Sequence, residues 1–158
     1  AFAFYKNSYI GRTFIKPTQE ERESSVHLKL SVLESVVKDK RIVLVDDSIV
    51  RGTTIANLIH MLKEAGAKEV HVRISSPPFL HPCYFGTDVP SNDQLIAASH
   101  STEEICKMIG ADSLGYMQTD YLEGMAGGLP LCKACFDGNY PMEIPDYTNA
   151  EFADIVKC

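Results

Sequence analysis

The sequence of 158 residues lacks any long apolar run, and no secretory signal opens it. A membrane-spanning helix needs about 20 consecutive apolar residues, so we expect no membrane partner. Positive charge is also in deficit, because 15 Lys and Arg residues face 21 Asp and Glu residues, for a net charge of −6. A surface that binds nucleic acid in bulk has to neutralise many phosphates, so we expect no nucleic-acid partner.

The composition is that of an ordinary globular domain, with 45% hydrophobic and 23% charged residues. The length suits one core of usual size. The first residue is Ala, and residues 1–5 have the pattern of a strand already under way. We therefore expect the chain to be part of a longer protein and its fold to be incomplete at the N-terminus.

A strand, a loop and a helix follow one another between residues 42 and 66. Residues 42–45 are a short apolar, β-branched run, which predicts a strand buried on both faces of a parallel sheet. A helical stripe comes next and ends at Gly66; it consists of Ile55, Leu58, Ile59, Leu62 and Ala65. The loop before this helix lies at the carboxyl end of a strand, where open α/β sheets bind ligands.

The loop has the residue types of a phosphate site. Hydroxyls, a glycine that permits close backbone approach, and the unpaired N–H groups of a helix start all suit a phosphate; the side chains concerned are those of Ser48, Gly52, Thr53 and Thr54. Asp46 and Asp47 would repel a phosphate unless something lies between them. A hydrated Mg²⁺ or the hydroxyls of a ribose would remove that conflict.

Two alternative sites share part of this pattern. A response-regulator receiver also places acids at strand ends, but its phospho-acceptor should follow a later strand, and residues 51–54 have no role there. A strand that ends in a solvated acid pair, followed by an N-capped helix, accounts for Asp47 or Ser48 as a cap. It does not account for the whole stretch.

The remaining pattern is that of an α/β domain with a mostly parallel sheet flanked by helices. Capping boxes are expected at Ser91 with Gln94 and at Ser101 with Glu104. The other expected elements are a strand at 2–5, a long loop at 8–22, a partly helical stretch from 24 to 37, strands at 70–74 and 113–117, a possible short strand at 84–86, and helices at 91–99, 101–109 and 120–126.

The acid pair and the loop together resemble the phosphoribosyl pyrophosphate (PRPP) signature of type I phosphoribosyltransferases. The resemblance implies that Asp46 and Asp47 hold the catalytic position and meet Mg²⁺ or the ribose hydroxyls of PRPP. It also implies that the loop wraps the 5′-phosphate; the substrate-binding residues would be Ser48, Ile49, Val50, Arg51, Gly52, Thr53 and Thr54.

A longer set of motifs occurs in order along the chain, at residues 9–15, 45–54, 64–67, 75–78 and 109–112. Together these motifs resemble one family more closely, the glutamine PRPP amidotransferases. This resemblance covers roughly residues 1 to 145. It implies transfer of glutamine-derived ammonia to PRPP, giving 5-phosphoribosylamine in the first step of purine synthesis. The implied partners are PRPP, glutamine with a glutaminase domain, inhibitory purine nucleotides and further copies of the chain, and the implied location is the cytoplasm.

In that family a flexible loop closes over PRPP, and residues 9–22 match it. Lys6, Tyr9 and Arg12 would then lie near the pyrophosphate or a feedback nucleotide. Closure has a physical purpose, because ammonia must attack the anomeric carbon while water is excluded.

The cysteines include a Cys-x-x-Cys pair at Cys132 and Cys135, which by itself is compatible with zinc, redox chemistry or chance. Five cysteines beside a phosphate-type loop favour a reducing compartment. With Cys83, the pair resembles the branch of the family that carries a structural [4Fe–4S] cluster, whose fourth ligand would lie upstream of this chain. Cys106 is expected to be a core thiol, and Cys158 a tail residue.

We expect a partial phosphoribosyltransferase domain at residues 1–126 and a cysteine-bearing C-terminal segment at 127–158. The glutaminase domain and the pyrophosphate-binding loop of the family would lie upstream, so we expect the fragment to be inactive alone. A regulatory module that senses PRPP and controls transcription is an alternative. That alternative requires a basic surface or an attached DNA-binding segment, and neither is visible.

Overall fold

The computed structural model describes residues 3–6, 30–86 and 91–144. Its centre is a parallel sheet of three strands in the order β3 (Arg41–Asp46), β4 (Glu69–Ile74) and β5 (Ser113–Tyr116). The register places Asp46 beside Ile74 and Ile74 beside Tyr116, so the three carboxyl ends meet at one edge. This arrangement confirms the predicted parallel α/β sheet.

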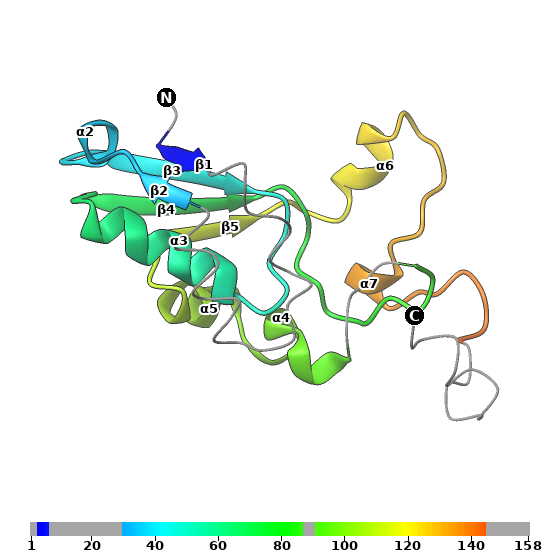
Figure 1. Cartoon of the computed structure of the whole chain (residues 1–158). Coiled ribbons are helices and arrows are strands. Elements are labelled where there is room, and N and C mark those ends of the chain that lie inside the picture. The colour runs from blue at the N-terminus through cyan, green and yellow to red at the C-terminus, as the bar shows by residue number, and fades with distance from the viewer. Residues whose placement is uncertain (1–2, 7–29, 87–90, 145–158) are drawn as a thin grey trace.

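Two helices lie along one side of the sheet, α3 (Thr53–Glu64) and α5 (Thr102–Met108) (Figure 1). Both connect parallel strands, and both bury apolar side chains against them. The core between sheet and helices consists of Val37, Ile49, Ile55, Ile59, Leu62, Val70, Val72, Ile74, Ile105 and Ile109. The predicted stripe of α3 is therefore its buried face, and Gly66 follows its end with a φ of 87°.

The prediction that residues 42–45 are buried on both faces is wrong. The side chains of Val43 and Val45 are 64% and 68% exposed. The reason is that the side chains of Val43 and Val45 lie on the face of the sheet opposite α3 and α5. A buried parallel strand needs cover on both faces, and no described helix covers this one.

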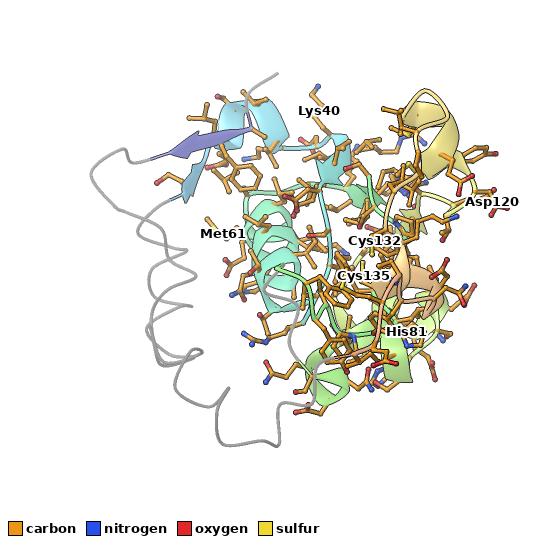
Figure 2. The ribbon with its side chains drawn as sticks, turned by 90° about the vertical axis from the view of Figure 1, so that its right-hand side faces the viewer. Lys40, Met61, His81, Asp120, Cys132 and Cys135 are labelled. Atoms are coloured by element: carbon orange, nitrogen blue, oxygen red, sulfur yellow. The ribbon has the colours of Figure 1, made fainter. Side chains whose placement is uncertain are left out.

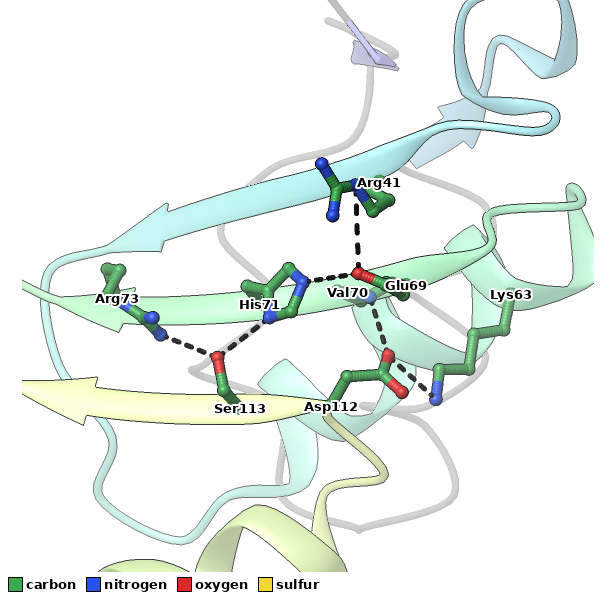
Figure 3. Close-up of polar contacts among 8 residues, drawn as sticks. All are labelled: Arg41, Lys63, Glu69, Val70, His71, Arg73, Asp112 and Ser113. Atoms are coloured by element: carbon green, nitrogen blue, oxygen red, sulfur yellow. Dashed lines mark hydrogen bonds and ion pairs between the residues drawn. The ribbon is translucent and has the colours of Figure 1, made fainter.

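The uncovered face carries a network of polar side chains (Figure 3). His71 contacts the Ser113 hydroxyl through Nδ1 and the Glu69 carboxylate through Nε2, both at 2.9 Å. Arg73 donates to the same hydroxyl at 3.0 Å, and Arg41 lies 3.9 Å from Glu69. Polar contacts thus join all three strands across the face opposite the core.

Asp112 joins the start of β5 to β4 and α3 (Figure 3). Its Oδ2 accepts a hydrogen bond of 2.7 Å from the backbone N–H of Val70 and lies 3.4 Å from Lys63 Nζ. The Val70 N–H, and after it Lys63, lower the pKa of the Asp112 carboxyl. These contacts fix the strand that follows α5 against the sheet.

A short antiparallel pair stands beside the main sheet, formed by β1 (Phe4–Lys6) and β2 (Leu30–Val32). The predicted helical stretch from 24 to 37 is therefore wrong at residues 30–32, where cross-strand pairing determines the structure. Only α2 (Glu34–Val37) is helical there, and residues 24–29 lie outside the described part. The predicted strand at 2–5 is confirmed for Phe4 and Tyr5.

The segment after β4 also differs from its prediction. Instead of one helix at 91–99, it forms a 3₁₀ turn, η2 (Asn92–Gln94), and one helical turn, α4 (Ile96–Ser99). The expected capping box at Ser91 is absent, since Ser91 donates to Asp93 instead. The box at Ser101 and Glu104 is confirmed. Residues 84–86 are not a strand.

Two short helices complete the described chain, α6 (Tyr121–Met125) and α7 (Ala134–Asp137). Figure 1 shows both beyond the edge where the strands end. Within the described ranges no helix is long and apolar enough to cross a membrane. The division at residue 126 stays a prediction.

Candidate functional site

The predicted site lies where β3 ends. The chain turns after Asp46 and enters α3 at Thr53. Ile49 is only 3% exposed and belongs to the core, whereas Asp47 and Arg51 are exposed. One buried side chain therefore anchors the middle of the loop and leaves its polar groups at the surface.

The two acids differ in environment. Asp46 is half-buried, and its Oδ1 accepts a 3.0 Å hydrogen bond from the Asp47 N–H. Asp47 is exposed, and its Oδ1 accepts a 3.0 Å bond from the Ser48 hydroxyl. Burial raises the pKa of the Asp46 carboxyl; the Asp47 N–H opposes this, and the Asp47 charge adds to it. The structure thus brings two carboxylates to one strand end at a cost that a bound cation would offset.

The two carboxylates suit a Mg²⁺ ion that binds together with a phosphorylated substrate. In the described part of the chain no three His, Cys, Asp or Glu side chains form a cluster that could hold a metal. Mg²⁺ is usually held by one or two carboxylates together with substrate phosphates and water. Asp46 and Asp47 can supply those carboxylates to a metal that arrives with a phosphorylated substrate.

The loop ends in a helix start that suits an anion. Gly52 precedes α3 with a φ of 83°, a left-handed conformation that other residues rarely adopt. No side chain of a described residue caps this start, so its first N–H groups remain available. With the hydroxyls of Thr53 and Thr54, these N–H groups can bind a phosphate.

A second segment, which contains Gln94 and Ile96, supports the loop. The residue pattern of this segment does not predict that role. The N–H of Ile96 donates to the Val50 carbonyl at 2.9 Å, and Arg51 donates to the Gln94 side chain. The capping box predicted for Gln94 involves only nearby residues, so it could not predict a contact with Arg51, which lies 43 residues away in the sequence. Only tertiary structure brings the two together.

Three predicted binding residues are not placed at the site. Tyr9 and Arg12 lie outside the described residues, as does the whole predicted loop at 8–22. Lys6 is the last residue of β1, and its side chain is not described. The roles of these three residues stay predictions.

Cys83, Cys132 and Cys135 belong to a separate unit built from residues 79–85 and 131–140. The backbone N–H groups of Leu80 and His81 both donate to the Cys135 carbonyl, at 2.9 and 3.1 Å. Figure 2 shows Cys132 and Cys135 close together, with His81 on the adjoining segment. Gly138 lies against the His81 ring, which a Cβ at that position would approach to 3.0 Å.

Aromatic side chains hold the two segments of this unit together. The rings of Phe79 and Phe136 are 5.0 Å apart, and those of Tyr84 and Tyr140 are 5.3 Å apart. The Tyr140 hydroxyl donates to the Pro82 carbonyl at 2.8 Å. Contacts of this kind can hold the two segments in place without a metal.

Two neighbouring thiols affect the ionisation of Cys135. Burial raises the pKa of the Cys135 thiol, and the neighbouring Cys83 and Cys132 raise it further. Thiolates placed together in this way repel each other unless a cation or a cluster binds them. As they are placed, the three thiols do not form a group that could hold a metal. An iron–sulfur cluster or zinc would need these thiols closer together and a fourth ligand from elsewhere.

Comparison with known proteins supports the fold. Residues 4–75 match the family described as Phosphoribosyl transferase domain. The amidophosphoribosyltransferase of Bacillus subtilis is 52% identical over an alignment of 148 positions, which covers 88% of this chain and 30% of that protein. The amidophosphoribosyltransferase of Pyrococcus horikoshii is 59% identical over 136 residues, which are 86% of this chain and 30% of that protein.

A solved structure agrees with these sequence matches. The glutamine PRPP amidotransferase of B. subtilis, complexed with ADP and GMP, superimposes with a TM-score of 0.78 at 48% identity. The superposition covers 97% of this chain and 35% of that protein. The chain therefore has the type I phosphoribosyltransferase fold, with its parallel sheet and flanking helices, and it spans about 30% of the length of the relatives that it matches.

The close approach at Gly52 gives a test with an internal control. Gly52→Ala and Gly110→Ala both place a methyl group on a residue with positive φ, which costs about 1–2 kcal/mol of unfolding free energy. At Gly52 the methyl would also lie 3.1 Å from Ile96 Cδ1, whereas at Gly110 nothing lies within 4 Å. We expect Gly52→Ala to destabilise the protein more in urea unfolding. An equal loss of unfolding free energy in the two variants would show that Ile96 does not hinder a methyl group at position 52.

Proposed function

We propose that this chain, which has the phosphoribosyltransferase fold and resembles amidophosphoribosyltransferases over most of its length, is the PRPP-binding part of such an enzyme. The reaction transfers ammonia, released from glutamine by hydrolysis, to the anomeric carbon of PRPP. A C–N bond forms, the C–O bond to pyrophosphate breaks, and the products are 5-phosphoribosylamine and pyrophosphate. The observation that carries the proposal is the acid pair at the end of β3, followed by the uncapped start of α3.

The described residues divide into two groups within this reaction. Asp46 and Asp47 would hold the ribose hydroxyls or the Mg²⁺ that accompanies the pyrophosphate. Mg²⁺ would supply charge neutralisation as the pyrophosphate leaves. The loop from Ser48 to Thr54 would bind the 5′-phosphate through hydroxyls and N–H groups. Each group then fixes one end of the sugar, which orients the anomeric carbon between them.

The rest of the reaction is assigned to the remainder of the parent protein. The chain spans about 30% of the length of its relatives, so a glutamine-hydrolysing domain and further pyrophosphate contacts have room outside it. Closure by residues 9–22, with Tyr9 and Arg12 near the pyrophosphate, would keep water from the anomeric carbon. Support for this step comes from sequence resemblance.

Regulation by purine nucleotides is part of the same proposal. The B. subtilis relative was solved with ADP and GMP bound. A site that binds the ribose and 5′-phosphate of PRPP has the chemistry to accept the same groups of a nucleoside monophosphate. We therefore propose that nucleotides compete with PRPP at residues 46–54, and that the enzyme acts as a homo-oligomer in the cytoplasm.

We further propose that the cysteine unit holds a structural [4Fe–4S] cluster. The support is that Cys83 and Cys132 both raise the pKa of the Cys135 thiol, and that aromatic packing brings their two segments together. Cys83, Cys132 and Cys135 would be three of the ligands, and the fourth would come from the part of the parent outside this chain. The cluster lies apart from Asp46 in this scheme and carries out no step of ammonia transfer.

Neutralising the acid pair tests the assignment of the reaction. In the full-length enzyme, Asp46→Asn combined with Asp47→Asn should lower PRPP-dependent formation of 5-phosphoribosylamine by at least about 100-fold, because the charges that hold Mg²⁺ and ribose are lost. Glutamine hydrolysis measured on its own should remain detectable. Unchanged transfer by the double variant would refute the proposed role of this site.

Metal analysis tests the cluster. Anaerobically purified full-length protein should contain about four iron and four inorganic sulfide per chain. Cys132→Ser should lower both, while Cys106→Ser, which alters a thiol of α5 outside the unit, should leave both unchanged. Stoichiometric zinc without iron would contradict the cluster and favour a structural zinc site.

A further inference from the structure

The segment from Ser91 to Ser99 contacts three consecutive residues of the phosphate loop. The N–H of Ile96 donates to the Val50 carbonyl at 2.9 Å, and Gln94 Oε1 accepts a hydrogen bond from Arg51 Nη2. Ile96 Cδ1 lies 3.1 Å from the place that a Cβ on Gly52 would occupy. A single segment therefore restrains the loop by a backbone bond, a side-chain bond and an apolar contact.

The broken helix explains how one short segment makes all three contacts. η2 ends at Gln94, and α4 begins at Ile96, with Leu95 extended between them at φ −91° and ψ 104°. In extended backbone, the residues before and after a given position point to the same side, and the residue itself points to the other. Leu95 is 1% exposed and anchors the segment, while its two neighbours contact the loop.

Arg51 depends on Gln94 for its position. Gln94 is the one hydrogen-bonding partner of Arg51 among the residues that the structure describes. Both side chains line an open hollow of about 550 Å³, together with His100 and Met108. An arginine side chain next to a space of this size has many rotamers available, so it needs a fixed acceptor to keep its guanidinium in one place.

We propose that Gln94 is a positioning residue for PRPP binding, acting through Arg51. The inference rests on the proposed function, in which residues 48–54 bind the 5′-phosphate. With its guanidinium held by Gln94, Arg51 presents a positive charge beside a phosphate site that otherwise carries two carboxylates. Without Gln94, the guanidinium takes up many positions around the hollow that it lines, and its charge is at the site for less of the time.

The test uses substitutions at Gln94 in the full-length enzyme. Gln94→Ala should raise the KM for PRPP about 3- to 10-fold, the effect of losing one hydrogen bond of ordinary net strength, and change kcat less than about 2-fold. Gln94→Glu keeps an acceptor for Arg51 but adds a carboxylate whose charge offsets that of Arg51, so it should not restore the KM of the parent. The control is Asn92→Ala, which alters an exposed side chain that makes no polar contact with any described residue and should change neither constant.

Repeating the Gln94→Ala substitution in an Arg51→Ala enzyme distinguishes a role in positioning Arg51 from general damage to the fold. In an Arg51→Ala enzyme, adding Gln94→Ala should change the KM for PRPP less than about 2-fold, because the residue through which Gln94 acts is gone. An unchanged KM in Gln94→Ala, or an equal rise on both backgrounds, would overturn the inference. If the variant with both Asp46→Asn and Asp47→Asn fails in transfer while Gln94→Ala behaves normally, only this inference is wrong. If that acid-pair variant transfers normally, the proposed function is wrong.

Discussion

The parallel register between β3 and β4 is the constraint on which the rest of the site depends. It sets Asp46 beside Ile74, and the next residue, Ser75, donates its N–H to the Asp46 carbonyl at 3.0 Å. This bond holds the end of β3 where the loop begins. From there the buried Ile49 fixes the middle of the loop, and Gly52 allows the turn into α3. A shift of the register by one residue would reverse which side chains of β3 meet the core.

The charges of the site explain why it needs both a cation and a second supporting segment. Two carboxylates stand at one strand end, one of them half-buried, in a protein of net charge −6. A phosphate ligand adds more negative charge, so Mg²⁺ and Arg51 carry the compensation in our proposal. A mobile guanidinium compensates less than a fixed one, which gives Gln94 its proposed role. The cysteine unit, by contrast, is held by aromatic packing of its own.

The elements that could be predicted are those whose structure depends on residues close together in the sequence. The strand, loop and helix from Arg41 to Glu64 were found because their periods and turn residues are local, and the Ser101 capping box was found for the same reason. Exposure of Val43 and Val45 could not be foreseen, because a β-branched run does not reveal whether a helix covers it. The Arg51 and Gln94 contact was missed because nothing in either local pattern points across 43 residues.

Hydrogen exchange tests the central claim most directly, namely that the turn after β3 is where PRPP binds. The full-length protein would be followed by mass spectrometry with Mg²⁺ alone and with Mg²⁺ and PRPP. We predict slower exchange for the backbone amides of residues 48–55, and a smaller effect at Ile96, whose N–H is bonded to Val50. The Asp46→Asn variant should lose this protection. Saturating PRPP that leaves the exchange of residues 48–55 unchanged would contradict the account.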